Sequence, residues 1–317
     1  MELPINNKML KLNSKPPRGF WAQVWKDRWI YIIMLPGIAF FIIFRYVPIY
    51  GIQLAFKKMD ISLGITGSPW IGLENFRLLF LDREFFYALR NTLIISFMQL
   101  VFYFPFPVAL AILLNEVMNR KLKRVLQTVF TFPRFLSWVI VAGIMLNLLA
   151  NNGAINNLLN VAGMDKISFL TSKSLFRFIL VFTSIWKEAG WATILYLATI
   201  TSIDPSLYEA ATIDGANRWH RIRYITWPGI QLIVLTTLIL RVGHMMDAGF
   251  DQIMNLYNPT VLEVADILDT YIYRITFQKT PNFGFSTAVG LFKGVTNCIL
   301  LLSVNWVCNK YNNSGIM

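Results

Sequence analysis

The sequence is poor in the residues that hold metals and disulfides. It has two cysteines and two histidines in 317 residues. Cys298 and Cys308 stand ten positions apart in one apolar run, which would separate them by roughly 15 Å on a helix, too far for a disulfide. His220 and His244 are isolated. The sequence therefore predicts no metal site, and it offers neither paired acids nor a nucleophile beside a base for an enzyme.

Charge is also scarce. Only 15% of the residues are charged and 56% are hydrophobic, whereas soluble domains carry about a quarter charged residues. This excludes an ordinary soluble domain and predicts a membrane protein. The net charge of +12 does not require nucleic acid, because basic residues of membrane proteins gather in cytoplasmic loops and meet anionic lipid. We expect membrane lipid, and no nucleic acid, among the partners.

A phosphate-binding loop is missing as well. No G-x-x-x-x-G-K-[ST] pattern occurs, and the glycines and lysine of GLFKGV at 290–295 have the wrong spacing and lie in an apolar run. The chain is thus expected to bind no nucleotide or other cofactor itself. Any ATP hydrolysis linked to it must come from another polypeptide.

Long apolar runs define the fold class. Each is close to the ~20 residues that a helix needs to cross a bilayer. The sequence predicts an all-α membrane protein with six transmembrane helices, some containing proline, which neighbouring helices make tolerable. The expected spans are 29–50, 88–115, 125–150, 175–201, 229–248 and 286–309.

A tryptophan recurs every four positions just before the first span, at Trp21, Trp25 and Trp29. This spacing fits an amphipathic helix in the headgroup region, and it fits equally an aromatic belt ahead of the span. The first apolar run is long enough to span and has no small-residue cleavage site after it. We therefore expect it to remain as a signal anchor.

Basic residues are distributed unevenly between the loops. The N-terminal arm, the short loop after the second span, the segment 204–228 and the tail are basic, whereas the loop between the last two spans is acidic. The positive-inside rule then predicts that both termini and segment 204–228 lie in the cytoplasm.

Segment 204–228 is a polar island between two apolar runs. Its first part favours helix, an Asp-Gly pair favours a turn, and a second helical stretch runs up to Pro228, which stops or restarts the helix. A helix–turn–helix on the membrane surface would suit docking onto another protein, although an ordinary loop with an amphipathic helix would give the same local pattern.

EAATIDGA followed by IRYITWPGI in this island resembles the EAA loop of the membrane subunits of ABC importers. Trp227 departs from the family, which usually has leucine before the proline, and no second proline follows soon after Pro228. Five further segments are similar to the sugar-importer branch, and most similar to permeases for complex oligosaccharides or polysaccharide breakdown products. They are SPWIGLENF (68–76), LRNTL (89–93), GFDQIMNLYNP (249–259), VADILDTYIYR (264–274) and AVGLFKG (288–294).

The resemblance implies a type I importer permease that is not an enzyme and that moves an oligosaccharide across the bacterial cytoplasmic membrane by alternating access. It implies an arm at 1–28, a permease domain at 29–309 and a tail at 310–317. The implied partners are a second homologous permease, two copies of a cytoplasmic ATPase and an external solute-binding protein. The loop 204–228 would couple to the ATPase, which uses ATP and Mg. The contact residues that the resemblance implies are Glu209, Ala210, Ala211, Asp214, Gly215 and Arg218. Gly215 would permit a close turn, in which a side chain should clash, and Glu209 would pair with a basic group of the ATPase.

Polar residues inside the spans are functional candidates, because burying them in lipid is costly. A sugar path needs groups that pair with hydroxyls and aromatic faces, but each such residue can equally serve hydrogen bonding between helices or subunits. The spans also hold Arg134, Arg241 and Asp247. The candidate path residues are Lys187, Glu188, Trp191, Tyr196, Tyr103, Asn147 and His244.

An ion- or proton-coupled secondary transporter is the alternative function. It would need paired acids or broken helices at the membrane midplane, and Glu188 and Asp247 are the acids placed to serve. The outer loops, 51–87 and 249–285, are expected to meet the binding protein, unless they form a packed cap without a partner.

Overall fold

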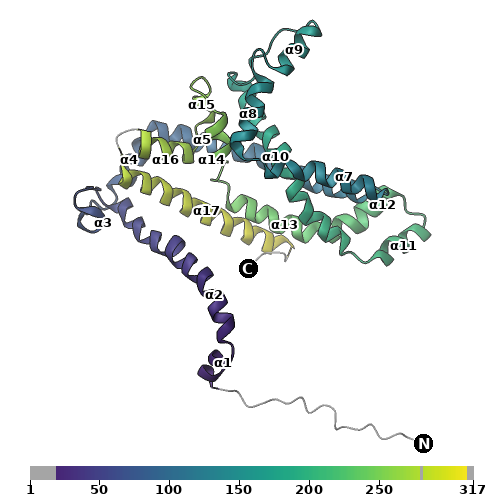
Figure 1. Cartoon of the computed structure of the whole chain (residues 1–317), viewed down its shortest axis with the longest axis horizontal. Helices are drawn as coiled ribbons and strands as arrows, with labels where there is room; N and C mark the ends of the chain where they lie inside the picture. The colour runs from purple at the N-terminus through teal and green to yellow at the C-terminus, as the bar shows by residue number, and fades with distance from the viewer. Residues whose placement is uncertain (1–18, 279–280, 313–317) are drawn as a thin grey trace, which may run out of the picture. The chain divides into compact units, whose positions relative to one another are not determined.

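The computed structural model describes residues 19–278 and 281–312 (Figure 1). The chain folds as two compact units, residues 1–53 and residues 54–317. Expectations for residues 1–18 of the arm and 313–317 of the tail lie outside the described residues. Over the part that is described, the chain is almost entirely helical, and one isolated bridge between Lys57 and Trp70 is the only β pairing.

The first unit contains a short helix and the first apolar segment. Helix α1 covers Phe20–Lys26 and α2 covers Arg28–Phe41. A π-helical turn, Ile42–Tyr46, and a 3-10 segment, Val47–Phe56, continue α2, and the boundary between the units falls inside the last of these. The short helix forms where the tryptophan spacing predicts one, with Trp25 and Trp29 exposed.

The second unit holds the remaining long helices. Helix α5 (Arg83–Met98), a π-helical turn (Gln99–Tyr103) and α6 (Pro105–Asn115) form one continuous segment. Then follow α7 (Arg120–Thr131), α8 (Trp138–Leu149), α9 (Ala154–Val161), α10 (Lys173–Thr201), α11 (Pro205–Ile213), α12 (Arg218–Arg221), α13 (Trp227–Gly243) and α17 (Phe283–Asn312). The shorter helices are α3 (Gly64–Gly67), α4 (Glu74–Leu81), α14 (Phe250–Leu256), α15 (Leu262–Ala265) and α16 (Leu268–Tyr273).

Six segments of the described chain are long and apolar enough to cross a membrane, so the predicted fold class is confirmed. Each is far longer than a typical helix of a soluble protein. The six are Arg28–Phe56, Arg83–Asn115, Trp138–Val161, Lys173–Thr201, Arg218–Gly243 and Phe283–Lys310.

The third predicted span, 125–150, is wrong in its bounds. Residues from Arg120 to Thr131 form a separate helix with no buried residue, basic at its start and apolar along one face. A 3-10 turn that contains Pro133 follows the end of α7. Ser137 then caps α8 by accepting a hydrogen bond from the Ile140 amide at 3.3 Å. Proline lacks the amide hydrogen that a continuing helix would use. The fifth span also ends early, at Gly243 rather than 248, because the chain turns there.

Helix α10 is the centre of the second unit, and α6, α7 and α13 pack along it (Figure 1). Half of its most apolar window is buried, more than in any other described span. A Cβ atom added at Gly190 would overlap the backbone carbonyl of Phe130, so this glycine lets α7 lie directly against α10. One core cluster forms where α6, α10 and α13 meet, around Val108, Tyr196 and Ile230.

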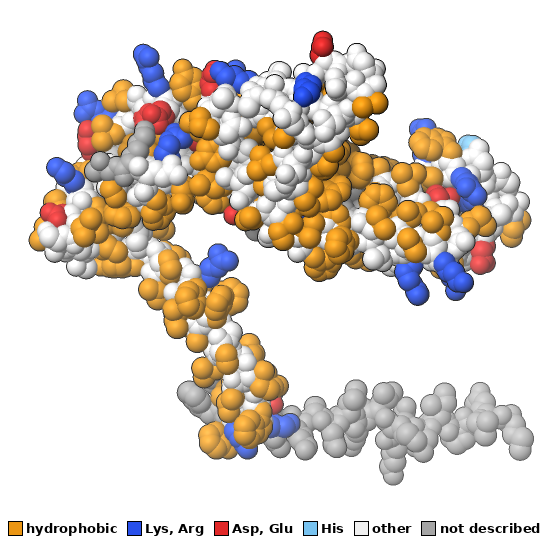
Figure 2. Space-filling view, turned by 45° about the horizontal axis from the view of Figure 1, so that its top comes forward, with side chains coloured by type: hydrophobic (Ala, Val, Ile, Leu, Met, Phe, Trp, Pro, Cys, Tyr) orange, Lys and Arg blue, Asp and Glu red, His pale blue; other side chains and the backbone are white. Residues whose placement is uncertain are grey.

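Charged side chains gather at the two ends of this unit, and hydrophobic side chains cover the part between them (Figure 2). Lysine and arginine dominate at the end with α11 and α12, whereas both signs of charge mix at the end with α4 and α16. A central apolar band between polar ends is the distribution that a bilayer imposes.

Candidate functional site

The polar island folds as a helix with defined ends. Asp204 caps α11 by accepting a hydrogen bond from the Ser206 amide at 2.9 Å, and Pro205 occupies the first helical position. At the other end, the Gly215 amide donates to the Thr212 carbonyl at 3.1 Å and the Ala216 amide to the Ala211 carbonyl at 2.8 Å. This pair of bonds is a Schellman motif, the common way for a helix to stop at a glycine.

Gly215 has a φ of +77°, a conformation that side chains other than glycine and asparagine adopt reluctantly. A Cβ atom added there meets nothing within 4 Å. The expectation that a side chain would clash in this turn is therefore wrong. The requirement for glycine comes from the backbone, and the space beside the turn is open.

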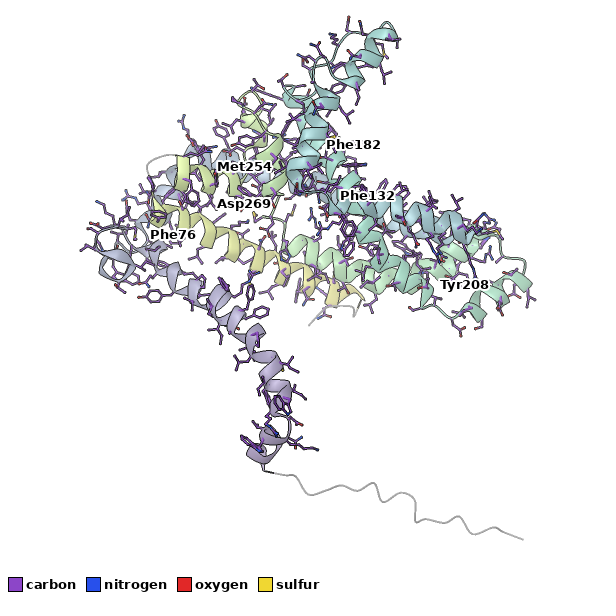
Figure 3. All side chains as sticks on the ribbon, viewed as in Figure 1. Phe76, Phe132, Phe182, Tyr208, Met254 and Asp269 are labelled. Atoms are coloured by element: carbon purple, nitrogen blue, oxygen red, sulfur yellow. The ribbon has the colours of Figure 1, made fainter. Side chains whose placement is uncertain are left out.

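The chain then leads into α13 through α12, which Asn217 caps, and the π-helical turn Ile222–Thr226. The Tyr208 hydroxyl lies 3.0 Å from the Thr226 hydroxyl and ties α11 to this returning segment (Figure 3). Arg221 donates to the Thr212 hydroxyl at 3.3 Å. These two cross-links hold the helix–turn–helix together as one projecting element.

A groove of about 580 Å³ lies between this element and the end of α6. Glu209, Arg218 and Arg221 contribute charged side chains to its lining. The Glu209 side chain is exposed and makes no hydrogen bond or ion pair with another described residue, so its carboxylate is available to a partner. Ile213, at 87% exposure, is an apolar side chain at the tip. The predicted contact residues thus share one exposed element, with Ala211 alone half-buried.

The Asp204 carboxyl that caps α11 has a lowered pKa. Hydrogen bonds from Ser206 hold the pKa of this carboxyl below its usual value near 3.8, and the group remains exposed. A depressed pKa means that the cap is fully formed above the ordinary carboxyl pKa and is lost only as the pH falls through the lower folded value. The α11 start is therefore stable throughout the neutral range.

A second polar cluster lies deep in the second unit. Lys187, at the midpoint of α10, is 4% exposed. Its ammonium donates to Glu188 at 3.1 Å and to the Arg134 carbonyl at 3.2 Å, and it lies 5.1 Å from the centre of the Trp138 ring. Glu188 also pairs with the guanidinium of Arg134. Two cations therefore share one carboxylate, and the neighbours Lys187 and Glu188 form one of the two ion pairs.

Tyr103 and Tyr196 belong to the same region. The Tyr103 hydroxyl is within electrostatic range of Glu188, Arg134 and Tyr196, and Arg241 lies over its ring at 5.7 Å. The Tyr196 hydroxyl is 2.8 Å from that of Thr237. Trp191 is half exposed and meets the edge of the Phe135 ring, with centroids 6.2 Å apart.

Two of the predicted path residues do not join this cluster. Asn147 donates to the Gly143 carbonyl of its own helix at 2.8 Å. His244, beyond the end of α13, lies 2.9 Å from the Leu240 carbonyl through Nδ1. Both make local bonds within one helix, as side chains do when they have no distant partner.

Three residues of the cluster around Lys187 are not among the predicted path residues: Arg134, Arg241 and Gln99. Arg134 and Arg241 are visible in the sequence as charges inside apolar runs, but which of the many intramembrane polar residues come together depends on how the helices pack. The π-helical turn Gln99–Tyr103 is the local signal, because such turns often mark functional sites. In the chain that the structure describes, no group of three or more His, Cys, Asp and Glu side chains is arranged to hold a metal ion.

The chain is similar to membrane components of known transport systems. The family model of the binding-protein-dependent transport system inner membrane component matches residues 107–310. The Bacillus subtilis (strain 168) polygalacturonan/rhamnogalacturonan transport system permease protein YteP is 42% identical over 292 residues, which cover 92% of this chain and 91% of that protein.

Two solved structures are similar over nearly the whole chain. One is of a bacterial ABC transporter involved in the import of the acidic polysaccharide alginate, with a TM-score of 0.84, 40% identity, and coverage of 92% of this chain and 99% of that chain. The other is of a bacterial alginate ABC transporter in complex with an alginate pentasaccharide-bound periplasmic protein, with a TM-score of 0.85, 38% identity, and coverage of 94% and 100%. The chain therefore belongs to the binding-protein-dependent transport system inner membrane components, as a multi-pass permease of the ABC importer type that serves transport and is not an enzyme.

Proposed function

We propose that this chain is the permease subunit of an ATP-driven importer that moves an oligosaccharide across the cytoplasmic membrane by alternating access. It pairs with a second homologous permease and receives its cargo from an external solute-binding protein. Two copies of a cytoplasmic ATPase, which use ATP and Mg, dock at the loop 204–228. The chain itself binds no cofactor, and both of its termini lie in the cytoplasm.

The similarity along 94% of the chain to a chain of an alginate transporter crystallised with its periplasmic protein is the observation that carries this proposal. The loop adds physical support. Its capped helix, its Schellman turn and the unpaired carboxylate of Glu209 form a small rigid element that exposes charge to a partner. ATP-driven closure of the ATPases would move this element and bias the spans between two states.

Lys187, Glu188, Trp191, Tyr196 and Tyr103 are the residues of the proposed substrate path. They offer an ion pair, two tyrosine hydroxyls and the half-exposed ring of Trp191 to a sugar. The local bonds of Asn147 and His244 favour a structural role for these two side chains.

The secondary-transporter alternative receives less support. The two acids that it needs already hold cations of this chain: Glu188 pairs with Arg134 and Lys187, and Asp247 lies 2.5 Å from the Lys293 ammonium. An ion-coupling carboxylate must exchange its partner during transport. ATP-driven uptake that is indifferent to an uncoupler would separate the two mechanisms.

The Gly215 turn tests the coupling role of the loop. Gly215→Val forces a β-branched residue into φ +77°, whereas Gly215→Asn is the matched control because asparagine tolerates the left-handed region. We expect the valine variant to insert normally and to lose sugar-stimulated ATP hydrolysis and uptake at least tenfold, and the asparagine variant to keep most of both. Full uptake by Gly215→Val would contradict docking through this turn.

A further inference from the structure

The cluster in the middle of the second unit carries more positive than negative charge. Arg134, Lys187 and Arg241 bring three cations, and Glu188 is the carboxylate that contacts two of them. Arg241 makes a hydrogen bond to the neutral side chain of Gln99 and lies over the Tyr103 ring. Within the described residues it has no ion pair, and Asp247, which reaches it only at longer range, is paired with Lys293.

The depth of this cluster makes the imbalance costly. Gln99 is the midpoint of the span Arg83–Asn115, and Lys187 is the midpoint of Lys173–Thr201. Both lie far from the ends of their spans, where a charge without a counter-ion is strongly unfavourable. Arg241 stands near the end of the span Arg218–Gly243 and reaches this level through its hydrogen bond to Gln99. A chain that keeps Arg241 there without a carboxylate partner keeps it for something that arrives from outside the chain.

The open side of the cluster is suited to a sugar acid. The Arg134 side chain is 45% exposed although it belongs to an ion pair, so one edge of its guanidinium remains accessible. Phe135 follows Arg134 in the chain, exposes most of its side chain and packs against the half-exposed Trp191. Phe135 also lines a cavity of about 570 Å³ between α7 and α10. The planar fork of an arginine matches a carboxylate in two parallel hydrogen bonds, and an aromatic face suits the apolar face of a sugar ring.

We propose that Arg241 and Arg134 bind the carboxylates of an anionic oligosaccharide as it passes the middle of the membrane, so that the cargo is a chain of uronic acid units. Lys187 is a positioning residue, since its ammonium is occupied by Glu188 and by the Arg134 carbonyl. This inference rests on the proposed function and narrows the cargo within it.

The first test uses the complete transporter, with its partner permease, ATPases and binding protein, in proteoliposomes. It is given tetragalacturonate, an alginate tetramer and maltotetraose, each at saturating binding protein. We expect uptake of one of the two uronate tetramers. Uptake of none of the three would contradict the proposed function itself, whereas uptake of maltotetraose alone would contradict the inference and leave the function standing.

The second test separates the permease from the binding protein, which selects cargo before it arrives. The imported uronate is compared with a partly methyl-esterified form that the binding protein still binds, as titration of that protein verifies. Arg241→Gln and Arg134→Gln should each raise the KM for the free acid about tenfold and change the KM for the partial ester less. Arg241→Lys should restore part of the loss, and Arg124→Gln, an exposed cation on α7, should change neither.

Equal losses for acid and ester in both glutamine variants would overturn the proposal and leave these arginines a structural role. Should Arg241→Gln fail to assemble, the comparison rests on the half-exposed Arg134→Gln and on Arg241→Lys, which keeps the charge. In that case, an Arg134→Gln variant with wild-type KM for the acid would contradict the assignment.

Discussion

The loop 204–228 and the cluster around Lys187 use the same kinds of residue in opposite ways. In the loop, the Glu209 side chain is exposed and unpaired in the described chain, and the bonds that shape the element join residues no more than 18 positions apart. In the cluster, Glu188 is largely buried and holds two cations, one of them 54 positions away. The comparison teaches that an exposed charge is available to a partner protein, whereas a buried one is committed to holding helices together or to binding cargo.

Replacing each of the two glutamates by alanine tests this comparison most directly. Glu188→Ala leaves Arg134 and Lys187 without their carboxylate. Removing one member of a buried ion pair costs about 3–5 kcal/mol, and the partial exposure of Arg134 and Glu188 reduces this cost toward or below the lower value. We expect a large fall in the thermal midpoint of the purified permease in detergent, and poor recovery from membranes.

Glu209→Ala is the control for that change. It removes an exposed side chain without a partner in the described chain, so stability should change by less than about 0.5 kcal/mol. Sugar-stimulated ATP hydrolysis by the full complex should nevertheless fall. Equal thermal midpoints for the two variants would show that Glu188 is not structurally committed.

A second prediction concerns the contact between α7 and α10 beside the cluster. Gly190→Ala places a methyl group on the Phe130 carbonyl, and overpacking of this kind costs about 1–3 kcal/mol. Gly143→Ala on α8 is the matched control, because a Cβ atom there meets nothing within 4 Å. Thermal unfolding should be lowered in the first variant only, and a loss of similar size in both would contradict the packing described for α7.

A smaller effect is expected for a single neutral hydrogen bond near the path. Tyr196→Phe removes the hydroxyl that lies 2.8 Å from Thr237, at a cost of about 1 kcal/mol. Tyr224→Phe changes an exposed tyrosine of the loop and should leave the thermal midpoint unaltered. If Tyr196→Phe changes the KM for sugar but not stability, the hydroxyl belongs to the path more than to the fold.

The smallest expected effect is a pH dependence of the loop. Because the pKa of Asp204 is depressed, its cap should persist from pH 7 down to the ordinary carboxyl range and weaken only below it. Hydrogen exchange at the Ser206 amide should stay slow, after correction for the intrinsic rate, between pH 7 and 5. Asp204→Ser should keep this protection in more acidic buffer, and early loss of protection in both proteins would show that the cap does not control the end of the helix.

The sequence predicts the loop far better than the cluster, for physical reasons. Asp204, Pro205 and Gly215 act on the backbone within a few positions of themselves, so the sequence alone predicts the structure that they form. Arg134 meets Glu188, and Arg241 meets Gln99, only because segments far apart in the sequence pack together, and no local pattern encodes these contacts. The error in the third span has a related cause: α7 carries an apolar face that extends the apolar run of α8, and hydropathy alone does not separate two helices joined at Pro133.

Uptake by the reconstituted complex tests the central claim most directly. A labelled uronate tetramer, delivered by the binding protein, should accumulate in proteoliposomes only when ATP and Mg are present on the side of the loop 204–228, and an uncoupler should not change the rate. Accumulation without ATP that collapses with the uncoupler would contradict this account and identify an ion-driven transporter.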